Sequence, residues 1–155
     1  MPGPKLGAKV KAFKAAATNG EFNLADAKGK SLVLYFYPKD MTSGCTVESR
    51  EFAELHDKFR RAGASVLGLS RDSLKSHEKF REKESLPFPL LSDPEEKLCQ
   101  LFDVIREKSL YGRKYMGIER STFLIDAQGV LRHEWRKVKV AGHAQEVLDA
   151  VRALD

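Results

Sequence analysis

The chain has two cysteines, and the first lies where a thiol can be reactive. Residues 37–52 read YPKDMTSGCTVESREF, so Cys45 stands between a strand-like apolar run and a helix-like charged run. A thiol in the first turn of a helix faces N–H groups without partners and the positive end of the helix dipole. Both favour the thiolate, which is the nucleophilic form. The position of Cys45 therefore predicts a reactive thiol.

The neighbours of Cys45 support this interpretation over that of a cysteine packed as a small hydrophobic residue. Pro38 makes the preceding loop rigid. Thr42 offers a hydroxyl three residues before the sulfur, and Gly44 lets the backbone approach closely. Together these residues predict a small polar pocket around the thiol.

Composition excludes several other classes of protein. Of 155 residues, 42% are hydrophobic and 32% are charged, which is ordinary for a soluble globular protein and predicts one domain over residues 1–155. The net charge of +5 comes from 27 basic and 22 acidic residues that are interspersed along the chain. Because no arginine-rich block or aromatic ladder is present, we expect neither nucleic-acid nor membrane-surface binding.

Cysteine usage indicates an intracellular protein. Two cysteines make no disulfide framework, and neither has a CxxC partner or a histidine at zinc-ligand spacing. The N-terminus lacks the apolar core of a signal peptide, and no stretch approaches the roughly 18 apolar residues of a membrane span. We expect a cytoplasmic protein without a metal site. Two histidines on charged helical segments, His56 and His77, are expected at the surface.

Apolar periodicity divides the chain into strands and helices. The expected elements are a hairpin within residues 1–30, strands at 31–38 and 64–70, helices at 46–62, 73–83 (with Ser73 as N-cap), 94–102 and 142–154, and a hairpin at 121–135. Residues 104–115 are expected to form a charged surface loop. Strands that alternate with helices, without repeats, predict an α/β fold with a mixed central sheet flanked by helices.

Several segments resemble one known family. YFYPKDMTSGCTVE resembles the peroxidatic loop of peroxiredoxins, whose Pro-x-x-x-Thr-x-x-Cys pattern is filled by Pro38, Thr42 and Cys45. LSDPEEKLCQLFDV, MGIERSTFLID and VKVAGHAQEVL resemble segments of the Q-type, or bacterioferritin-comigratory, subfamily. The resemblance extends over nearly the whole chain and implies a thioredoxin-like fold with an N-terminal hairpin extension.

The resemblance also implies an activity and further site residues. It implies that Arg120 reaches the sulfur from a strand that is remote in the sequence. Without the resemblance, an arginine beside a strand would be interpreted as a solvated side chain at the strand end. Glu48 either holds this arginine by a charge-assisted pair or is an exposed first-turn carboxylate. The implied activity is a thiol peroxidase for hydrogen peroxide and organic hydroperoxides that forms a sulfenic acid on Cys45 and needs no cofactor. The expected hydrogen-bond donors to the leaving oxygen are the Thr42 hydroxyl, the Cys45 backbone N–H and the Arg120 guanidinium. Its partners would be peroxides and an external thiol reductant such as thioredoxin, glutaredoxin or glutathione.

The chain departs from the family where a second thiol is expected. The two usual positions of the resolving cysteine hold Arg50 and Arg81 in this sequence. The remaining thiol, Cys99, lies at the edge of an apolar helical stripe and is interpreted as structural, with an atypical resolving role as the alternative. We therefore expect a one-cysteine peroxidase. We separately expect a monomer. Two other classes remain open, a thioredoxin-fold binding or chaperone protein with an incidental cysteine and a disulfide oxidoreductase.

Overall fold

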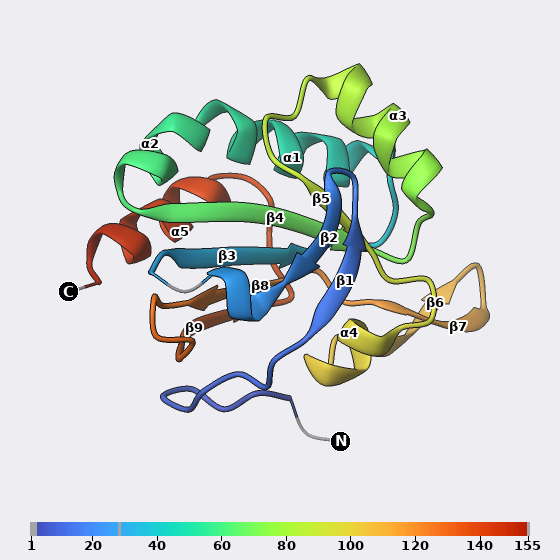
Figure 1. Cartoon of the computed structure of the whole chain (residues 1–155). Coiled ribbons are helices and arrows are strands. Elements are labelled where there is room, and N and C mark those ends of the chain that lie inside the picture. Colours follow the sequence, from blue (N-terminus) through green and yellow to red (C-terminus); the bar gives the residue numbers. More distant parts are fainter. Residues whose placement is uncertain (1–2, 28, 155) are drawn as a thin grey trace.

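The computed structural model describes residues 3–27 and 29–154 and contains a seven-stranded sheet with helices on both of its faces (Figure 1). The order of its strands is β2-β1-β5-β4-β3-β8-β9, and β6 and β7 form a separate hairpin. The strands are β1 (Lys14–Ala17), β2 (Gly20–Asn23), β3 (Ser31–Phe36), β4 (Ala64–Ser70), β5 (Leu90–Ser92), β6 (Ile105–Leu110), β7 (Arg113–Ile118), β8 (Ser121–Ile125) and β9 (Leu131–Arg136). The helices are α1 (Ser43–Glu54), α2 (His56–Arg61), α3 (Leu74–Glu84), α4 (Lys97–Leu101) and α5 (His143–Arg152), with a 3-10 turn at Leu24–Ala27.

The sheet is mixed, as the sequence predicts. β3 pairs in parallel with β4, and β4 in parallel with β5, whereas β8 and β9 add antiparallel strands beyond β3. β1 joins β5 in the antiparallel sense and forms the predicted N-terminal hairpin with β2. This arrangement is the thioredoxin-like fold expected from the resemblance.

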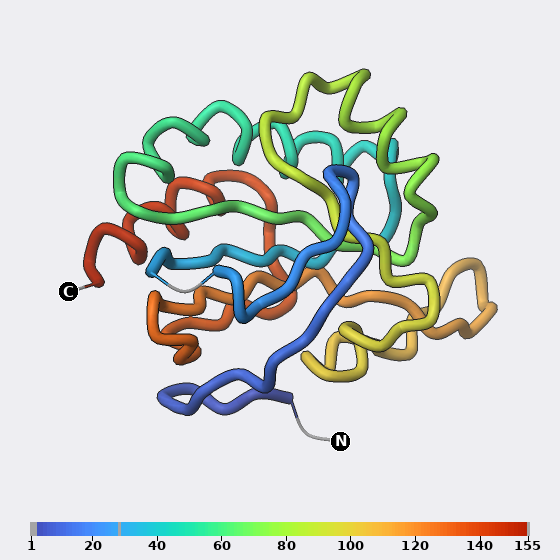
Figure 2. The backbone as a smooth tube through the Cα atoms, in the orientation of Figure 1, coloured from blue at the N-terminus to red at the C-terminus, as the bar shows by residue number. Residues whose placement is uncertain are grey.

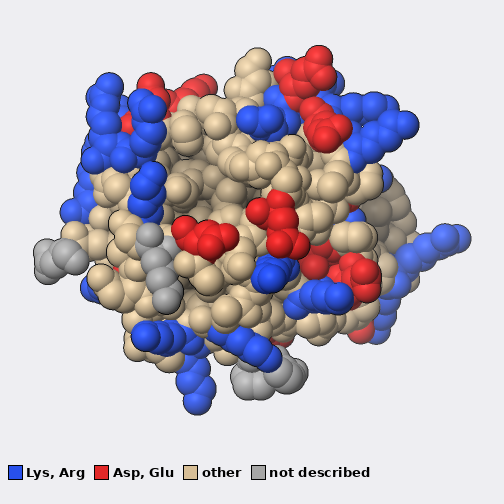
Figure 3. Space-filling view, in the orientation of Figure 1, with Lys and Arg blue, Asp and Glu red and all other residues tan. Residues whose placement is uncertain are grey.

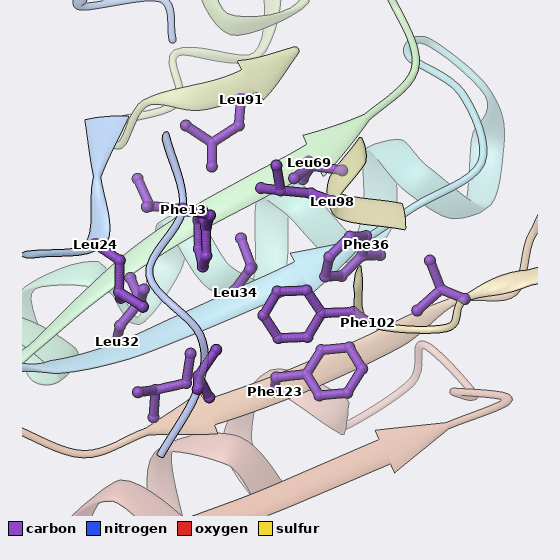
Figure 4. Packing of buried hydrophobic residues seen from close by; sticks show 14 of the residues in the cluster. Phe13, Leu24, Leu32, Leu34, Phe36, Leu69, Leu91, Leu98, Phe102 and Phe123 are labelled. Atoms are coloured by element: carbon purple, nitrogen blue, oxygen red, sulfur yellow. The ribbon is translucent and has the colours of Figure 1, made fainter. Parts of the chain in front are cut away.

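Alternate side chains of β3 enter two different cores, because successive residues of a strand point to opposite faces of a sheet. Leu34 and Phe36 enter the core that α4 and the N-terminal segment cover. There the Phe36 ring lies 5.2 Å from that of Phe102 and 5.5 Å from that of Phe123, centroid to centroid (Figure 4). Tyr35 enters the second core, which α1, α2, α3 and α5 cover. The burial of β3 on both faces explains its uninterrupted apolar sequence.

Some element boundaries differ from the expectation. The predicted helix at 46–62 is two helices, α1 and α2, that meet at Leu55, and α4 begins at Lys97, three residues after Pro94. The predicted charged loop at 104–115 is wrong, since most of it belongs to the antiparallel hairpin of β6 and β7. The predicted N-cap is confirmed, because the side chain of Ser73 accepts a hydrogen bond from the Ser76 N–H.

The topology brings two distant segments together at one end of β3. The chain leaves this end, crosses residues 37–42 and enters α1, on the same side of the molecule as the β6–β7 hairpin (Figure 2). Because β8 runs antiparallel to β3, with Ser121 opposite Phe36, the residue before Ser121 lies beside the same end. That residue is Arg120.

The surface carries interspersed charges. On the face drawn in Figure 3, basic and acidic side chains alternate with uncharged ones, in agreement with their mixture along the sequence. None of the helices in the described part of the chain has the length and apolar content of a bilayer-spanning segment.

Candidate active site

Cys45 lies in the first turn of α1 and its residue is only 1% exposed. The first helical hydrogen bond of α1 is donated by the Thr46 N–H to the Thr42 carbonyl, 2.9 Å between N and O. By helix geometry the N–H groups of residues 43–45 then have no acceptor within the helix. The thiol therefore has the position at the positive end of a helix that the sequence predicts, and it is almost completely buried.

Arg120 reaches the sulfur from the connection between β7 and β8. Its Nη2 donates to Sγ of Cys45 over 3.4 Å, and its Nη1 donates to Oε1 of Glu48 over 2.7 Å. The Arg120 side chain is 17% exposed, so it is not the solvated strand end of the alternative interpretation. A Cβ added to Gly44 would lie 3.1 Å from Nη2, so the glycine leaves the room that the guanidinium occupies.

Glu48 is a buried carboxyl, and its alternative interpretation as an exposed first-turn residue is wrong. Its side chain is 1% exposed, and Oε2 has no hydrogen-bond partner among the described residues. Burial raises the pKa of Glu48 from 4.5 to about 7, although the charge of Arg120 opposes this shift. The site therefore holds one carboxyl whose protonation changes near neutral pH.

Thr42 and Pro38 belong to the loop over the site. The Thr42 hydroxyl donates to the Lys39 carbonyl, 2.8 Å between the oxygens, and makes no side-chain cap to α1. Because its hydrogen is used in this way, the hydroxyl offers lone pairs to a neighbouring molecule, which differs from the donor role expected from the sequence. Pro38 is half-buried just after β3.

Sequence reasoning missed a polar cluster behind this loop. His77 was expected at the surface, but its residue is 0% exposed, and its Nδ1 lies 2.8 Å from Oδ2 of Asp40, within the loop. The charged neighbours of His77 hid its burial. The signal was its spacing from Phe80, three residues later on the same face of α3, which is also buried.

The second thiol lies on the other side of the sheet. Cys99 is 0% exposed and belongs to the core beneath α4, whereas Cys45 belongs to the core beneath α1. Burial, with a smaller contribution from Asp93, raises the pKa of Cys99 far above its ordinary value. Both features agree with the structural interpretation of this thiol.

The two arginines at the usual positions of the resolving cysteine form polar contacts with other elements. Arg50 on α1 pairs with Glu84 at the end of α3. The Nε of Arg81 donates to the Phe88 carbonyl over 3.0 Å.

Comparisons with known proteins agree with this geometry. A family profile described as the AhpC/TSA family matches residues 6–134. Peroxiredoxin Bcp of Bacillus subtilis is 50% identical over 149 residues, which are 96% of this chain and 95% of that protein. Peroxiredoxin Bcp of Xanthomonas campestris is 56% identical over 125 residues, which are 81% of this chain and 78% of that protein.

Solved structures of similar proteins share the fold. Xanthomonas campestris peroxiredoxin Q superposes with a TM-score of 0.87 at 51% identity, over 91% of this chain and 90% of that one. A Xylella fastidiosa PrxQ variant superposes with a TM-score of 0.93 at 42% identity, over 99% of this chain and 98% of that one. A further Xanthomonas structure, at 50% identity with a TM-score of 0.86 over 91% of this chain and 90% of that one, is described as a trapped intermediate and ligand complex that bears on alkyl peroxide reduction.

Proposed function

We propose that this chain, which belongs to the AhpC/TSA family, acts through Cys45 by a one-cysteine mechanism. Within the family it is a peroxiredoxin of the Q-type, or Bcp, group, and it is therefore a thiol peroxidase. The observation that carries this proposal is the pair of contacts that Arg120 makes, to the sulfur of Cys45 and to Glu48. A fixed positive charge 3.4 Å from a thiol at a helix N-terminus favours the thiolate and a bound oxygen anion alike.

In the first step the Cys45 thiolate attacks one oxygen of the peroxide. The S–O bond forms as the O–O bond breaks, the sulfur loses two electrons to the peroxide, and the leaving hydroxide or alkoxide takes up a proton. Negative charge moves from sulfur to the leaving oxygen, where positioned donors stabilise it. In this proposal the donors are the Arg120 guanidinium and the Cys45 backbone N–H.

The other site residues orient the reactants. The Thr42 hydroxyl, whose hydrogen is bonded to the Lys39 carbonyl, accepts a hydrogen bond from the peroxide O–H. Glu48 fixes the direction of the guanidinium through Nη1, so that Nη2 remains on the sulfur. Pro38 restricts the start of the loop.

The second step requires a thiol from outside the chain. Two solved forms of the Xanthomonas protein carry serine in place of two different cysteines, 36 positions apart. The same spacing from Cys45 leads to Arg81 in this chain, and the other usual resolving position is Arg50. Cys99 is buried beneath the opposite face of the sheet, so a disulfide with Cys45 would need more than local movement, since bridged Cα atoms lie within about 7 Å.

An external thiol would then attack the Cys45 sulfenic acid, form a mixed disulfide and release water. A second thiol would displace Cys45 and leave as the oxidised disulfide, which balances the two electrons given to the peroxide. We propose thioredoxin, glutaredoxin or glutathione as this reductant, and hydrogen peroxide and alkyl hydroperoxides as substrates. We also propose that the protein is a single-domain monomer. We propose a cytoplasmic location, because a chain without a disulfide framework suits a reducing compartment.

The test is mass spectrometry after one equivalent of peroxide, with and without a trap for sulfenic acid. The one-cysteine proposal expects a trapped sulfenic acid on Cys45 and no intramolecular disulfide. A Cys45–Cys99 disulfide in high yield, with turnover that is lost in Cys99→Ser, would refute it. Oxidation confined to Cys99 would refute the assignment of Cys45 itself.

A further inference from the structure

Asp40 fixes the middle of the loop over Cys45, although it does not contact the sulfur. One carboxylate oxygen, Oδ1, accepts from the Tyr37 hydroxyl over 2.6 Å. The other, Oδ2, lies 2.8 Å from Nδ1 of His77 and accepts from the Ser76 hydroxyl over 2.8 Å. The backbone N–H of Asp40 donates to Oδ2 of Asp72 over 2.8 Å. Side chain and backbone of one loop residue are thus tied to the residue that follows β3, to α3 and to the segment after β4.

His77 connects this residue to the sheet. Its Nε2 lies 2.8 Å from the Leu91 carbonyl in β5, and a carbonyl can only accept, so Nε2 carries a hydrogen. Its Nδ1 faces the Asp40 carboxyl, with the Tyr37 hydroxyl 3.4 Å away. Asp40 is 5% exposed and His77 is 0% exposed, so water does not compete for these hydrogen bonds.

The segment that follows Asp40 needs such an anchor. Met41 has a φ of +63°, a backbone conformation that residues other than glycine adopt only when their surroundings impose it. Its side chain is large and apolar and its residue is 45% exposed, so burial of the side chain does not hold it in place. The next residue, Thr42, is the N-cap of α1. The conformation of the cap is therefore held from its N-terminal side, by the hydrogen bonds of Asp40 and by the bond from the Thr42 hydroxyl to the Lys39 carbonyl.

The two steps of the proposed reaction make opposite demands on this loop. Attack on peroxide needs the closed arrangement, in which Arg120 donates to the sulfur and the first turn of α1 holds Cys45. Attack by an external thiol needs access to a sulfur that is 1% exposed, so the loop and the first turn must move outward. Tighter anchoring of the loop favours the first step and opposes the second.

We propose that Asp40 and His77 are a positioning pair that holds residues 38–42 closed over Cys45 and sets the balance between the two steps. The inference rests on the proposed function, and it assigns to these two residues an effect on reaction rates that a purely structural pair would not have. Loosening the pair slows formation of the sulfenic acid and speeds its reduction by a thiol. It also lowers further oxidation to sulfinic acid, because this second attack on peroxide again requires the closed arrangement.

Two amide substitutions at His77 separate its contacts. The amide nitrogen of asparagine falls near the place of Nδ1, and that of glutamine falls near the place of Nε2. His77→Asn therefore keeps an amide group beside Asp40 and loses the donor to Leu91, whereas His77→Gln keeps the donor to Leu91 and loses the contact with Asp40. The matched control is Lys79→Gln, an exposed position on the same helix.

The measurements are stopped-flow rates of the peroxide step and of the thiol step, and the yield of sulfinic acid at excess peroxide. His77→Gln should slow the peroxide step about 10- to 100-fold, the equivalent of one hydrogen bond to a charged group. It should also speed the thiol step and lower the sulfinic acid yield. His77→Asn, which keeps the contact with Asp40, should change these values less than His77→Gln does, and Lys79→Gln should stay near the wild-type values.

Thermal unfolding of each variant shows whether it is folded. If His77→Gln does not fold, Ser76→Ala provides a milder test, because it removes a single hydrogen-bond donor to Asp40. Equal effects of the two His77 substitutions, or a slowing of both steps together, would overturn the proposal. Cys45→Ser, measured in parallel, distinguishes this outcome from failure of the proposed function. If Cys45→Ser retains peroxidase activity, the function itself is wrong; if it is inactive, only the role of the pair is rejected.

Discussion

Replacing Glu48 with glutamine should change how the stability of the protein depends on pH. The pKa of Glu48 is raised from 4.5 to about 7 by burial, so the folded state binds a proton more tightly than the unfolded chain. The resulting stabilisation is complete below the unfolded value of 4.5 and is lost as the pH rises through about 7. At 1.36 kcal/mol for each pKa unit, the full loss is about 3 kcal/mol.

Most of this loss, about 2–3 kcal/mol, falls between pH 5 and pH 8. Glutamine has nearly the same shape, still accepts from Nη1 of Arg120 and does not titrate. Relative to the wild type, Glu48→Gln should therefore gain about 2–3 kcal/mol of unfolding free energy when the pH is raised from 5 to 8. The assay is urea unfolding of both proteins at pH 5 and at pH 8. The change in unfolding free energy between the two pH values is then compared between the wild type and Glu48→Gln.

Glu54→Gln is the matched control, because it removes an exposed carboxylate from the same helix. This control should show no comparable change between the two pH values. The reasoning fails if the stability difference between wild type and Glu48→Gln is the same at pH 5 and pH 8. If the wild type instead gained unfolding free energy relative to Glu48→Gln at pH 8, attraction to Arg120 would outweigh the cost of burying the carboxylate, whose Oε2 has no hydrogen-bond partner among the described residues.

Three further predictions concern the catalytic cycle. Cys45→Ser should fold normally and consume no peroxide above the buffer rate, because a serine hydroxyl is a much poorer nucleophile at neutral pH; activity near that of the wild type would exclude the mechanism. Arg120→Met should slow the peroxide step by about 10²–10³-fold and Arg120→Lys by less, since lysine keeps the charge without the planar set of donors; unchanged stopped-flow rates in both would remove Arg120 from the reaction. Cys99→Ser should turn over at nearly the wild-type rate with an external thiol, and sulfinic acid should accumulate in both proteins at excess peroxide; a selective loss of turnover, measured by coupled peroxide consumption, would restore Cys99 as a resolving thiol.

Local sequence was sufficient where a property depends on a few adjacent residues. The strand from Ala64 to Ser70, the cap at Ser73 and the turn between β8 and β9 follow from periodicity and turn chemistry over a short stretch. The boundary at Leu55 and the β6–β7 hairpin do not, because the break and the pairing depend on tertiary contacts that compete with local propensity.

The same distinction applies to the site. The sequence by itself determined that Cys45 follows a buried strand and opens a helix, and the resemblance of MGIERSTFLID identified Arg120 as its partner. Only the tertiary structure decided that the guanidinium lies within 3.4 Å of the sulfur, that His77 is buried and that Cys99 lies beneath the other face of the sheet. The reason is physical: the residues adjacent in the sequence fix the helix dipole and the cap, but the pairing of β8 with β3 and the crossovers around the sheet fix which remote side chains share a pocket.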